Sequence, residues 1–331
     1  MSKNVIHTPA LSRRFLYRWV VKMKLFLSNI TCVLALTTSA LTLAEPQSNF
    51  ELDGEIGAGV IFNSALSVDE LDDVSSQSDS GYEWNGVIKG KWQLSDKTKL
   101  SSSYAYNQKK YSEYSQYDLA LHQVSVDGSH KFNNSEVGLR VDGAQASLAG
   151  NTFLNYQQIS LYLGHFVQPQ TYLRSSVKIK NKSFADFSDR DASGLGASLD
   201  VFHFLDGANT MLMLGLNAEK EDAQDNQFDY WGIGIHTKLT YKFNVFGLGS
   251  KVGIGLRLQK KDYQSIELEM RPAEDVSERD ENRQVIEANW DLLLLDNLSV
   301  TTELQHGDFS SELESQTYQQ TNASVGLKYA F

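Results

Sequence analysis

The sequence predicts an all-β protein, a transmembrane, antiparallel, up-and-down β-barrel of about 14 strands (12 to 16 fit the pattern), preceded by a cleaved signal peptide. Three observations lead to this prediction. Apolar and polar residues alternate from residue 50 to the end, short and long connections alternate between the runs, and the last residue, Phe331, belongs to such a run. The mean hydropathy of −0.35 is compatible with a barrel, because only half of each strand faces lipid.

Residues 1–44 have the features of an export signal. The apolar stretch 25–44 ends in small residues that suit cleavage after Ala44 or Ala40. Its basic flank is made of Lys3, Arg13, Arg14, Arg18, Lys22 and Lys24. We expect a signal at 1–44, with Met23 as an alternative start, and a barrel at 45–331. The competing interpretation is a retained transmembrane anchor of about 20 residues.

Composition excludes several classes of protein. The only cysteine, Cys32, lies in the signal, so the barrel has no disulfide or thiolate chemistry. The formal net charge of −11 becomes more negative when the basic signal is removed, which argues against a nucleic-acid partner. After the signal no stretch of 18 residues is continuously apolar, so we expect no membrane-spanning helix there.

The first seven runs predict strands with one apolar and one polar face. The second run is the clearest, because Tyr82, Trp84 and Ile88 alternate with Glu83 and Lys89. The runs cover residues 50–60, 82–92, 100–106, 124–126, 137–141, 159–163 and 173–179.

Seven further runs complete the predicted barrel. In the tenth, Trp231, Ile233 and Ile235 alternate with small or polar residues such as His236 and Lys238. These runs cover residues 195–201, 212–216, 231–239, 252–258, 286–292, 298–304 and 321–331. An even number of strands places both ends of the barrel on one side, which we predict to be the periplasm.

The connections alternate in length. Short connections rich in Asp, Asn, Gly and Pro are expected at 93–98, 133–135, 167–170, 205–209, 244–250 and 295–297. Longer ones are expected at 62–81, 108–117, 147–152, 181–191, 219–228, 262–282 and 306–316. Short periplasmic turns and long outer loops are typical of outer-membrane barrels.

Aromatic residues recur where strands meet the short turns. Leu327, Tyr329 and Phe331 are interpreted as an assembly signal on the last strand. A periplasmic girdle in the headgroup layer is predicted for Trp92, Phe132, Phe166, Phe204 and Phe243. The competing interpretation is the aromatic core of a soluble sandwich. It is disfavoured because these strands keep charged residues on one face.

That charged face is predicted to line the lumen. The candidate lumen charges are Lys89, Arg140, Arg174, Lys178, Lys238, Arg257, Glu287 and Asp291. Two interpretations remain open: a charged lining that selects solutes, and a salt-bridged interior that holds the wall and passes little.

The predicted outer loops are acidic, at residues 68–83, 219–229 and 274–282. We expect solvated loop charge there rather than a calcium site, because no spaced set of ligands such as D-x-D-x-D-G occurs. The histidines lack metal-ligand spacing, and G-x-S-x-G is absent. His306 and Asp308 lie near a predicted rim, but such pairs are common in polar loops. We therefore predict no enzyme, metal or cofactor.

Two stretches resemble a known family. Residues 57–72 (GAGVIFNSALSVDELD) and 283–331 are similar to the two ends of the C-terminal barrel domain of surface lipoprotein assembly modifiers. The matching residues of the last strand are Tyr318, Gly326, Leu327, Tyr329 and Phe331. The resemblance implies a 14-stranded barrel that acts in lipoprotein export. Members of the family carry an N-terminal region of tetratricopeptide repeats, whereas here about five residues separate the predicted signal from the first strand.

The first functional hypothesis is a pore or solute channel in the outer membrane of a Gram-negative bacterium. The second is a barrel-only relative of the assembly modifiers, acting in export or surface display. The third is a structural or adhesive barrel that works through its acidic outer loops. The expected partners are outer-membrane lipid, lipopolysaccharide, the barrel-assembly machinery, and a small solute or a lipoprotein client.

Overall fold

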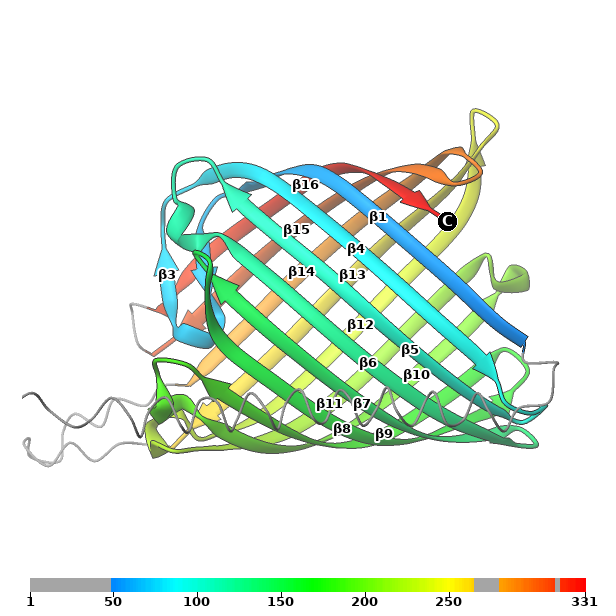
Figure 1. The fold of residues 1–331 in the computed structure, drawn as a ribbon, viewed down its shortest axis with the longest axis horizontal. Coiled ribbons are helices and arrows are strands. Elements are labelled where there is room, and N and C mark those ends of the chain that lie inside the picture. Colours follow the sequence, from blue (N-terminus) through cyan, green and yellow to red (C-terminus); the bar gives the residue numbers. More distant parts are fainter. Residues whose placement is uncertain (1–48, 265–279, 313–315) are drawn as a thin grey trace, which may run out of the picture. The chain divides into compact units, whose positions relative to one another are not determined.

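The computed structural model describes residues 49–264, 280–312 and 316–331, and within these residues fourteen strands form one closed antiparallel barrel (Figure 1). The strands are β1 (Asn49–Asn63), β4 (Asp79–Gln93), β5 (Thr98–Tyr111), β6 (Leu119–Phe132), β7 (Ser135–Leu148), β8 (Asn151–Gln168), β9 (Thr171–Phe184), β10 (Ala192–Leu205), β11 (Thr210–Ala223), β12 (Tyr230–Val245), β13 (Leu248–Tyr263), β14 (Glu281–Leu295), β15 (Leu298–Ser311) and β16 (Tyr318–Ala330). Each predicted run lies in one of these strands, so the predicted 14-stranded barrel is confirmed.

Each strand pairs with its neighbour in the sequence, and β1 pairs with β16 to close the ring. At the closing seam Gly54 and Phe331 exchange both backbone hydrogen bonds, at 2.9 Å each. The Phe331 ring also covers Gly54, where a Cβ atom would lie 2.4 Å from ring carbons. A side chain at position 54 would therefore displace the aromatic ring from the seam.

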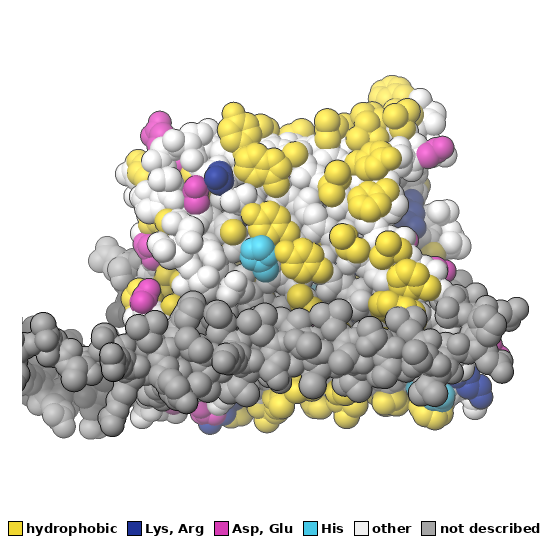
Figure 2. All heavy atoms as spheres, in the orientation of Figure 1, with side chains coloured by type: hydrophobic (Ala, Val, Ile, Leu, Met, Phe, Trp, Pro, Cys, Tyr) yellow, Lys and Arg dark blue, Asp and Glu magenta, His cyan; other side chains and the backbone are white. Residues whose placement is uncertain are grey.

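The two faces of the barrel wall differ in chemistry. On β8, for example, Ile159, Leu161 and Leu163 point outward and are exposed, while Ser160 and Tyr162 point inward. Figure 2 shows hydrophobic side chains across the middle of the outer face and charged side chains toward its two ends. Large apolar side chains remain exposed because lipid, not water, is their solvent.

The longer connections carry short elements of their own at one end of the barrel, at the left of Figure 1. The β1–β4 connection forms a small hairpin, β2 (Leu66–Val68) and β3 (Asp73–Ser75), joined by the 3₁₀ turn η1 (Asp69–Leu71). Three other connections at this end hold η2 (Ser115–Tyr117), η3 (Ser188–Arg190) and η5 (Asn226–Phe228), and a short turn at the opposite end holds η4 (Asp206–Ala208).

Several strands are longer than the sequence predicted. Residues 219–223, expected in a loop, continue β11, with Glu219 opposite Gly232 and Glu221 opposite Tyr230. The strands β5, β9, β13 and β15 also extend into predicted connections. Near the rim both faces of a strand become polar, so the hydrophobic alternation ends before the hydrogen-bonded ladder does.

Parts of the predictions lie outside the described residues, namely the signal at 1–44 and residues 274–279 of the third acidic loop. In the residues that are described, no helix is long and apolar enough to cross a bilayer.

Candidate functional site: the barrel lumen

All eight candidate lumen charges occupy inward positions of the wall, opposite the apolar face of their strands. Most of them form ion pairs with wall residues. Glu287 on β14 accepts from Lys238 on β12 at 3.0 Å and from Arg257 on β13 at 3.2 Å. Asp291 pairs with Lys251 at 3.1 Å, and Arg140 pairs with its near neighbour Asp142 at 2.8 Å.

Many long inward side chains lie along the wall, crossing a glycine on the strand between the two partners. Lys180 on β9 crosses Gly194 on β10 to reach Glu219 and Glu221 on β11, at 3.1 and 2.7 Å. A Cβ atom at Gly194 would lie 2.5 Å from Lys180 Cε, so glycine is required for this path. The pair of Lys238 and Glu287 spans β13 in the same way, beside Gly255. These ion pairs therefore run along the wall, from one strand across its neighbour to the next.

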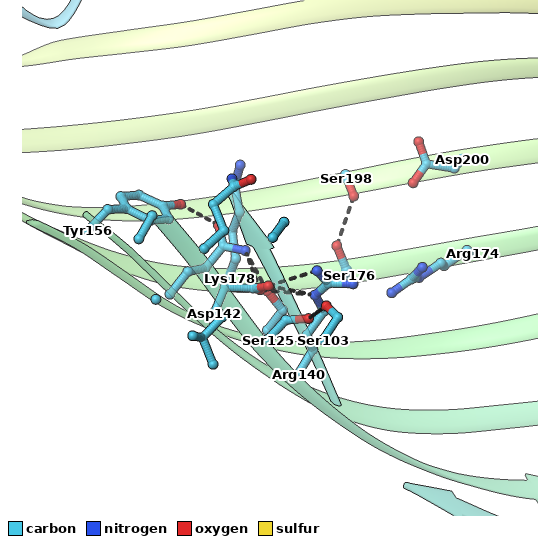
Figure 3. Close-up of a pocket in the computed structure, with 17 residues that line it drawn as sticks. Ser103, Ser125, Arg140, Asp142, Tyr156, Arg174, Ser176, Lys178, Ser198 and Asp200 are labelled. Carbon is cyan, nitrogen blue, oxygen red and sulfur yellow. Dashed lines mark hydrogen bonds and ion pairs between the residues drawn. The ribbon is translucent and has the colours of Figure 1, made fainter. Parts of the chain in front are cut away.

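A hollow of about 480 Å³ lies against the wall formed by β5–β10, and its lining is mostly polar (Figure 3). Side chains from neighbouring strands converge on it, including Arg140 with Asp142, and hydroxyl pairs such as Ser176 with Ser198 at 2.8 Å. Arg174 also lines the hollow, and its guanidinium group stacks 4.1 Å from the centre of the Tyr162 ring. The hollow can therefore hold a hydrophilic solute beside cationic and hydroxyl groups.

The connection between β1 and β4, residues 64–78, folds into one end of the lumen, and we call it the mouth loop. Its apolar anchor is Leu66, which is 1% exposed. Leu66 belongs to a buried cluster on the inside of the barrel whose other members are Val68, Tyr117, Ala146, Phe153, Leu154 and Phe184. Burial of the Leu66 side chain alone contributes about 1.5–3 kcal/mol.

Acidic residues of the mouth loop reach opposite sides of the barrel. Glu70 pairs with Lys182 on β9 at 2.8 Å, while Asp69 accepts a hydrogen bond from Tyr318 on β16 at 3.2 Å. Seven steps around the ring of fourteen strands separate β9 from β16, so the loop spans the full width of the mouth. Asp69 also pairs with Arg283 at 2.9 Å, and Asp72 with Arg190 at 2.7 Å.

These contacts correct two sequence predictions. The acids of residues 68–83 were expected to be solvated, but Asp69, Glu70 and Asp72 hold a loop inside the mouth. Those of residues 219–229 were also expected in a solvated loop. Instead Glu219 and Glu221 lie on the wall, where Tyr230 donates to them at 2.9 and 3.3 Å. The physical reason is that basic residues on the facing wall attract carboxylates inward.

Sequence reasoning missed Lys182 as a lumen residue. A signal for it was present, because Arg174, Lys178 and Lys180 continue at the same two-residue spacing to Lys182. Such a row of cations on one face of a strand requires carboxylates nearby. The partners come from β11 and from the mouth loop, which are distant in the sequence.

The mouth loop lies outside the spanning strands. The pKa of its residue Glu70 depends mainly on burial and on Lys182. Burial alone would raise the pKa of the Glu70 carboxyl group. The charge of Lys182 and the hydrogen bond that it donates outweigh this effect and lower the pKa of Glu70 below its ordinary value of 4.5.

The strand-end aromatics occupy two kinds of position. Trp92, Phe132 and Phe243 lie on outward positions of β4, β6 and β12, as do Leu327, Tyr329 and Phe331 at the end of the chain. Phe166 and Phe204 share the inward alternation of β8 and β10, and Phe166 packs 4.9 Å from the inward Tyr172.

The remaining polar candidates do not converge. His306 lies on the outward face of β15, where it shares a hydrogen bond of 2.9 Å with Thr321. Among the described residues no group of three or more His, Cys, Asp or Glu side chains has an arrangement that would hold a metal ion.

Comparison with known proteins agrees with the barrel architecture. A family model described as surface lipoprotein assembly modifier matches residues 64–331, which confirms the resemblance seen in the sequence. No curated protein matches the chain.

Solved structures share the fold at low sequence identity. The outer membrane channel DcaP of Acinetobacter baumannii matches with a TM-score of 0.52 and 10% identity, over 87% of this chain and 99% of that chain. A loop L8 deletion mutant of OmpT, an outer membrane protein of Vibrio cholerae, matches with a TM-score of 0.50 and 9% identity, over 86% and 99% of the two chains.

Proposed function

Since the chain belongs to the surface lipoprotein assembly modifier family and is an outer-membrane barrel, we propose that it is a pore for small hydrophilic solutes, narrowed at its outer mouth by the mouth loop. One observation carries this proposal. Lining charges run along the wall beside a polar hollow, and the mouth loop, in the part of the chain that the structure describes, reaches across one end of the lumen. The interpretation as a salt-bridged, closed interior fits the wall less well, because its ion pairs run along the wall rather than across the lumen.

The mouth loop is expected to limit the size of the solutes that pass through the pore. It is held by one apolar cluster and by ion pairs to Lys182, Arg190 and Arg283. A loop anchored in this way narrows the mouth and stays in place when the driving force is low. We expect small solutes to pass and larger ones to be excluded.

Planar-bilayer recording of the refolded barrel tests this proposal. We expect a stable, small conductance, and a severalfold larger one when residues 66–75 are replaced by a short Gly-Ser linker. A variant with Asp53→Asn, at the far end of the lumen, serves as the matched control and should conduct like the parent. A folded barrel that passes no current at any voltage, with or without the mouth loop, would exclude a pore.

A second candidate function is export or surface display of a lipoprotein, and it is favoured by the family match over residues 64–331. The test is co-expression with a lipoprotein encoded beside the gene, followed by protease accessibility of that lipoprotein on intact cells. Unchanged accessibility after deletion of the barrel would reject this function. The adhesive alternative is weakened because Asp69, Glu70, Glu219 and Glu221 face the lumen.

For assembly, we propose that the barrel-assembly machinery recognises the outward row of Leu327, Tyr329 and Phe331. The contacts between Phe331 and Gly54 support this, because the same residue also closes the ring. Deletion of Phe331 should reduce the heat-modifiable, folded band in outer-membrane fractions. Normal amounts of that band would show that the terminal aromatic is dispensable. The outward aromatics Trp92, Phe132 and Phe243 are proposed to lie in the headgroup layer.

A further inference from the structure

Four basic residues surround the mouth loop, and we call them the mouth cations: Lys182 on β9, Arg190 in η3, Lys261 on β13 and Arg283 on β14. Among residues 49–264, 280–312 and 316–331, the strands supply fewer carboxylates than there are mouth cations. Lys182 has Glu221 at 3.1 Å and Arg283 has Glu281 at 3.0 Å. Lys261 lies 4.6 Å from the centre of the Tyr230 ring and donates to the Tyr263 hydroxyl at 3.4 Å.

The mouth loop supplies the missing negative charge. Three ion pairs come from one short turn. They join Asp69 to Arg283, Glu70 to Lys182, and Asp72 to Arg190. Without the loop these cations would become open to solvent with an excess of positive charge over the described wall carboxylates. Such a cluster attracts a dissolved anion into the place of the loop.

The two sides of these contacts differ in their access to water. The Lys182 side chain is 10% exposed and that of Arg283 is 20% exposed. In two of the three contacts the loop carboxylate is more open than its cation, because Asp69 and Glu70 are 44% and 43% exposed; Asp72 is 12% exposed beside Arg190. A dissolved anion can therefore approach from the side of Asp69 and Glu70 and exchange with these two carboxylates first.

We propose that the mouth cations form a binding site for compact polyanions, and that the mouth loop fills this site with its own carboxylates until a solute displaces it. The ligand carries two or more carboxylate or phosphate groups, because guanidinium and ammonium groups at several points favour a multivalent partner. This inference rests on the proposed pore function and names the class of solute.

The wall below the site continues the same chemistry. Lys180, Lys178 and Arg174 follow Lys182 at alternate positions of β9, and Arg174 and Lys178 line the hollow (Figure 3). A polyanion released from the mouth would next meet these cations. The row therefore gives a path from the mouth to the hollow.

The position of the mouth loop can be followed without measuring current. The chain has no cysteine beyond Cys32, so Ser76→Cys on the exposed part of the loop can carry a single environment-sensitive fluorophore in the refolded barrel. Citrate and pyrophosphate are the probes, and acetate at equal ionic strength is the reference. We expect both polyanions to change the fluorescence with a saturable dose response, and acetate to have no such effect.

Two pairs of substitutions should move this response in opposite directions. With Asp69→Asn and Glu70→Gln the loop competes less, and the half-saturating citrate concentration should fall about threefold to tenfold. With Lys182→Gln and Arg283→Gln it should rise about tenfold or more. The control is the half-exposed pair of Lys91 and Asp53 at the far end of the lumen, where Lys91→Gln with Asp53→Asn should leave the response unchanged.

The outcomes separate this inference from the proposed function. If the barrel responds to citrate but carries no current, the binding site is supported and the pore function is rejected. A barrel that conducts but shows equal responses to citrate and acetate overturns the binding site alone. If citrate acts and pyrophosphate does not, the ligand class narrows to carboxylates.

Discussion

The outer mouth and the lower lumen use the same kind of ion pair under different solvation. Next to the mouth cations, Lys180 is 6% exposed and lies 2.7 Å from Glu221, the carboxylate that it shares with Lys182. Lower in the lumen, Lys251 is 44% exposed and lies 3.1 Å from Asp291. The distances are similar, and access to water differs. The comparison teaches that the mouth pairs hold a structure together, whereas the lower pairs form a solvated lining.

The largest expected difference between the two regions is in stability. Lys180→Met leaves Glu219 and Glu221 buried with less compensation and should lower the free energy of unfolding by about 3–5 kcal/mol. Lys251→Met should cost at most about 1 kcal/mol, because its pair is half-exposed. Urea unfolding of the refolded barrels measures both. Equal effects would remove the distinction between a structural mouth and a solvated lining.

Substitution of the two glycines that long side chains cross, Gly194 and Gly255, should also lower stability more near the mouth than in the lower lumen. The changes in unfolding free energy should be smaller than those for the lysines. At Gly194 a Cβ atom would meet both Lys180 Cε and, at 2.9 Å, the backbone oxygen of Lys220, so Gly194→Ala should destabilise the barrel by about 1–3 kcal/mol. At Gly255 the nearest atom is Glu287 Cγ, and this side chain is partly exposed and can move aside. Gly255→Ala should therefore change stability by less than about 1 kcal/mol. Gly143→Ala, with open space around its Cβ, is the control.

The mouth loop should also respond to acidic pH. Because the pKa of Glu70 is lower in the docked loop than its ordinary value of 4.5, the contribution of its pair to docking is complete above that value. It is lost as the pH falls through the lowered pKa. The cations that face Glu70 are Lys180, Lys182, Lys261 and Arg190.

Conductance or loop fluorescence between pH 6 and pH 3 measures this effect, and we expect a change of about twofold to fivefold. Glu70→Gln should remove the part of the change that belongs to this pair. A parent barrel with no change over that range would show that the Glu70 pair does not hold the loop.

The smallest stability effect is expected for Arg257 in the lower lumen. Its side chain is 54% exposed and shares Glu287 with Lys238, so Arg257→Gln should change the unfolding free energy by less than about 0.5 kcal/mol. The same substitution removes a positive charge from the lining. The reversal potential measured in a salt gradient should therefore shift toward cation selectivity. A larger shift for Gly194→Ala, which changes no charge, than for Arg257→Gln would contradict the proposed lining.

The sequence predicted the wall well because the wall is locally determined. In β9, Leu173 and Val177 alternate with Arg174 and Lys178, and this alternation alone gives the strand and its two faces. The mouth could not be predicted in this way. Glu70 and Lys182 are 112 residues apart, and nothing near Glu70 indicates that its loop turns inward. Glu219 and Glu221 were placed in a loop because the apolar alternation of β11 fades near Ala218, although the ladder continues.

The hydrogen bonds between Gly54 and Phe331 have a consequence for the order of events in biosynthesis. They belong to the seam that joins β1, the first strand of the ring, to β16, the last of its strands to be synthesised. A nascent or partly exported chain therefore has two unpaired sheet edges and cannot become a ring, whatever the state of its other strands. Because unpaired edges invite aggregation, the chain is best kept unfolded until β16 is available to pair with β1. Closure is thus a single late event that converts an aggregation-prone sheet into a membrane-compatible one.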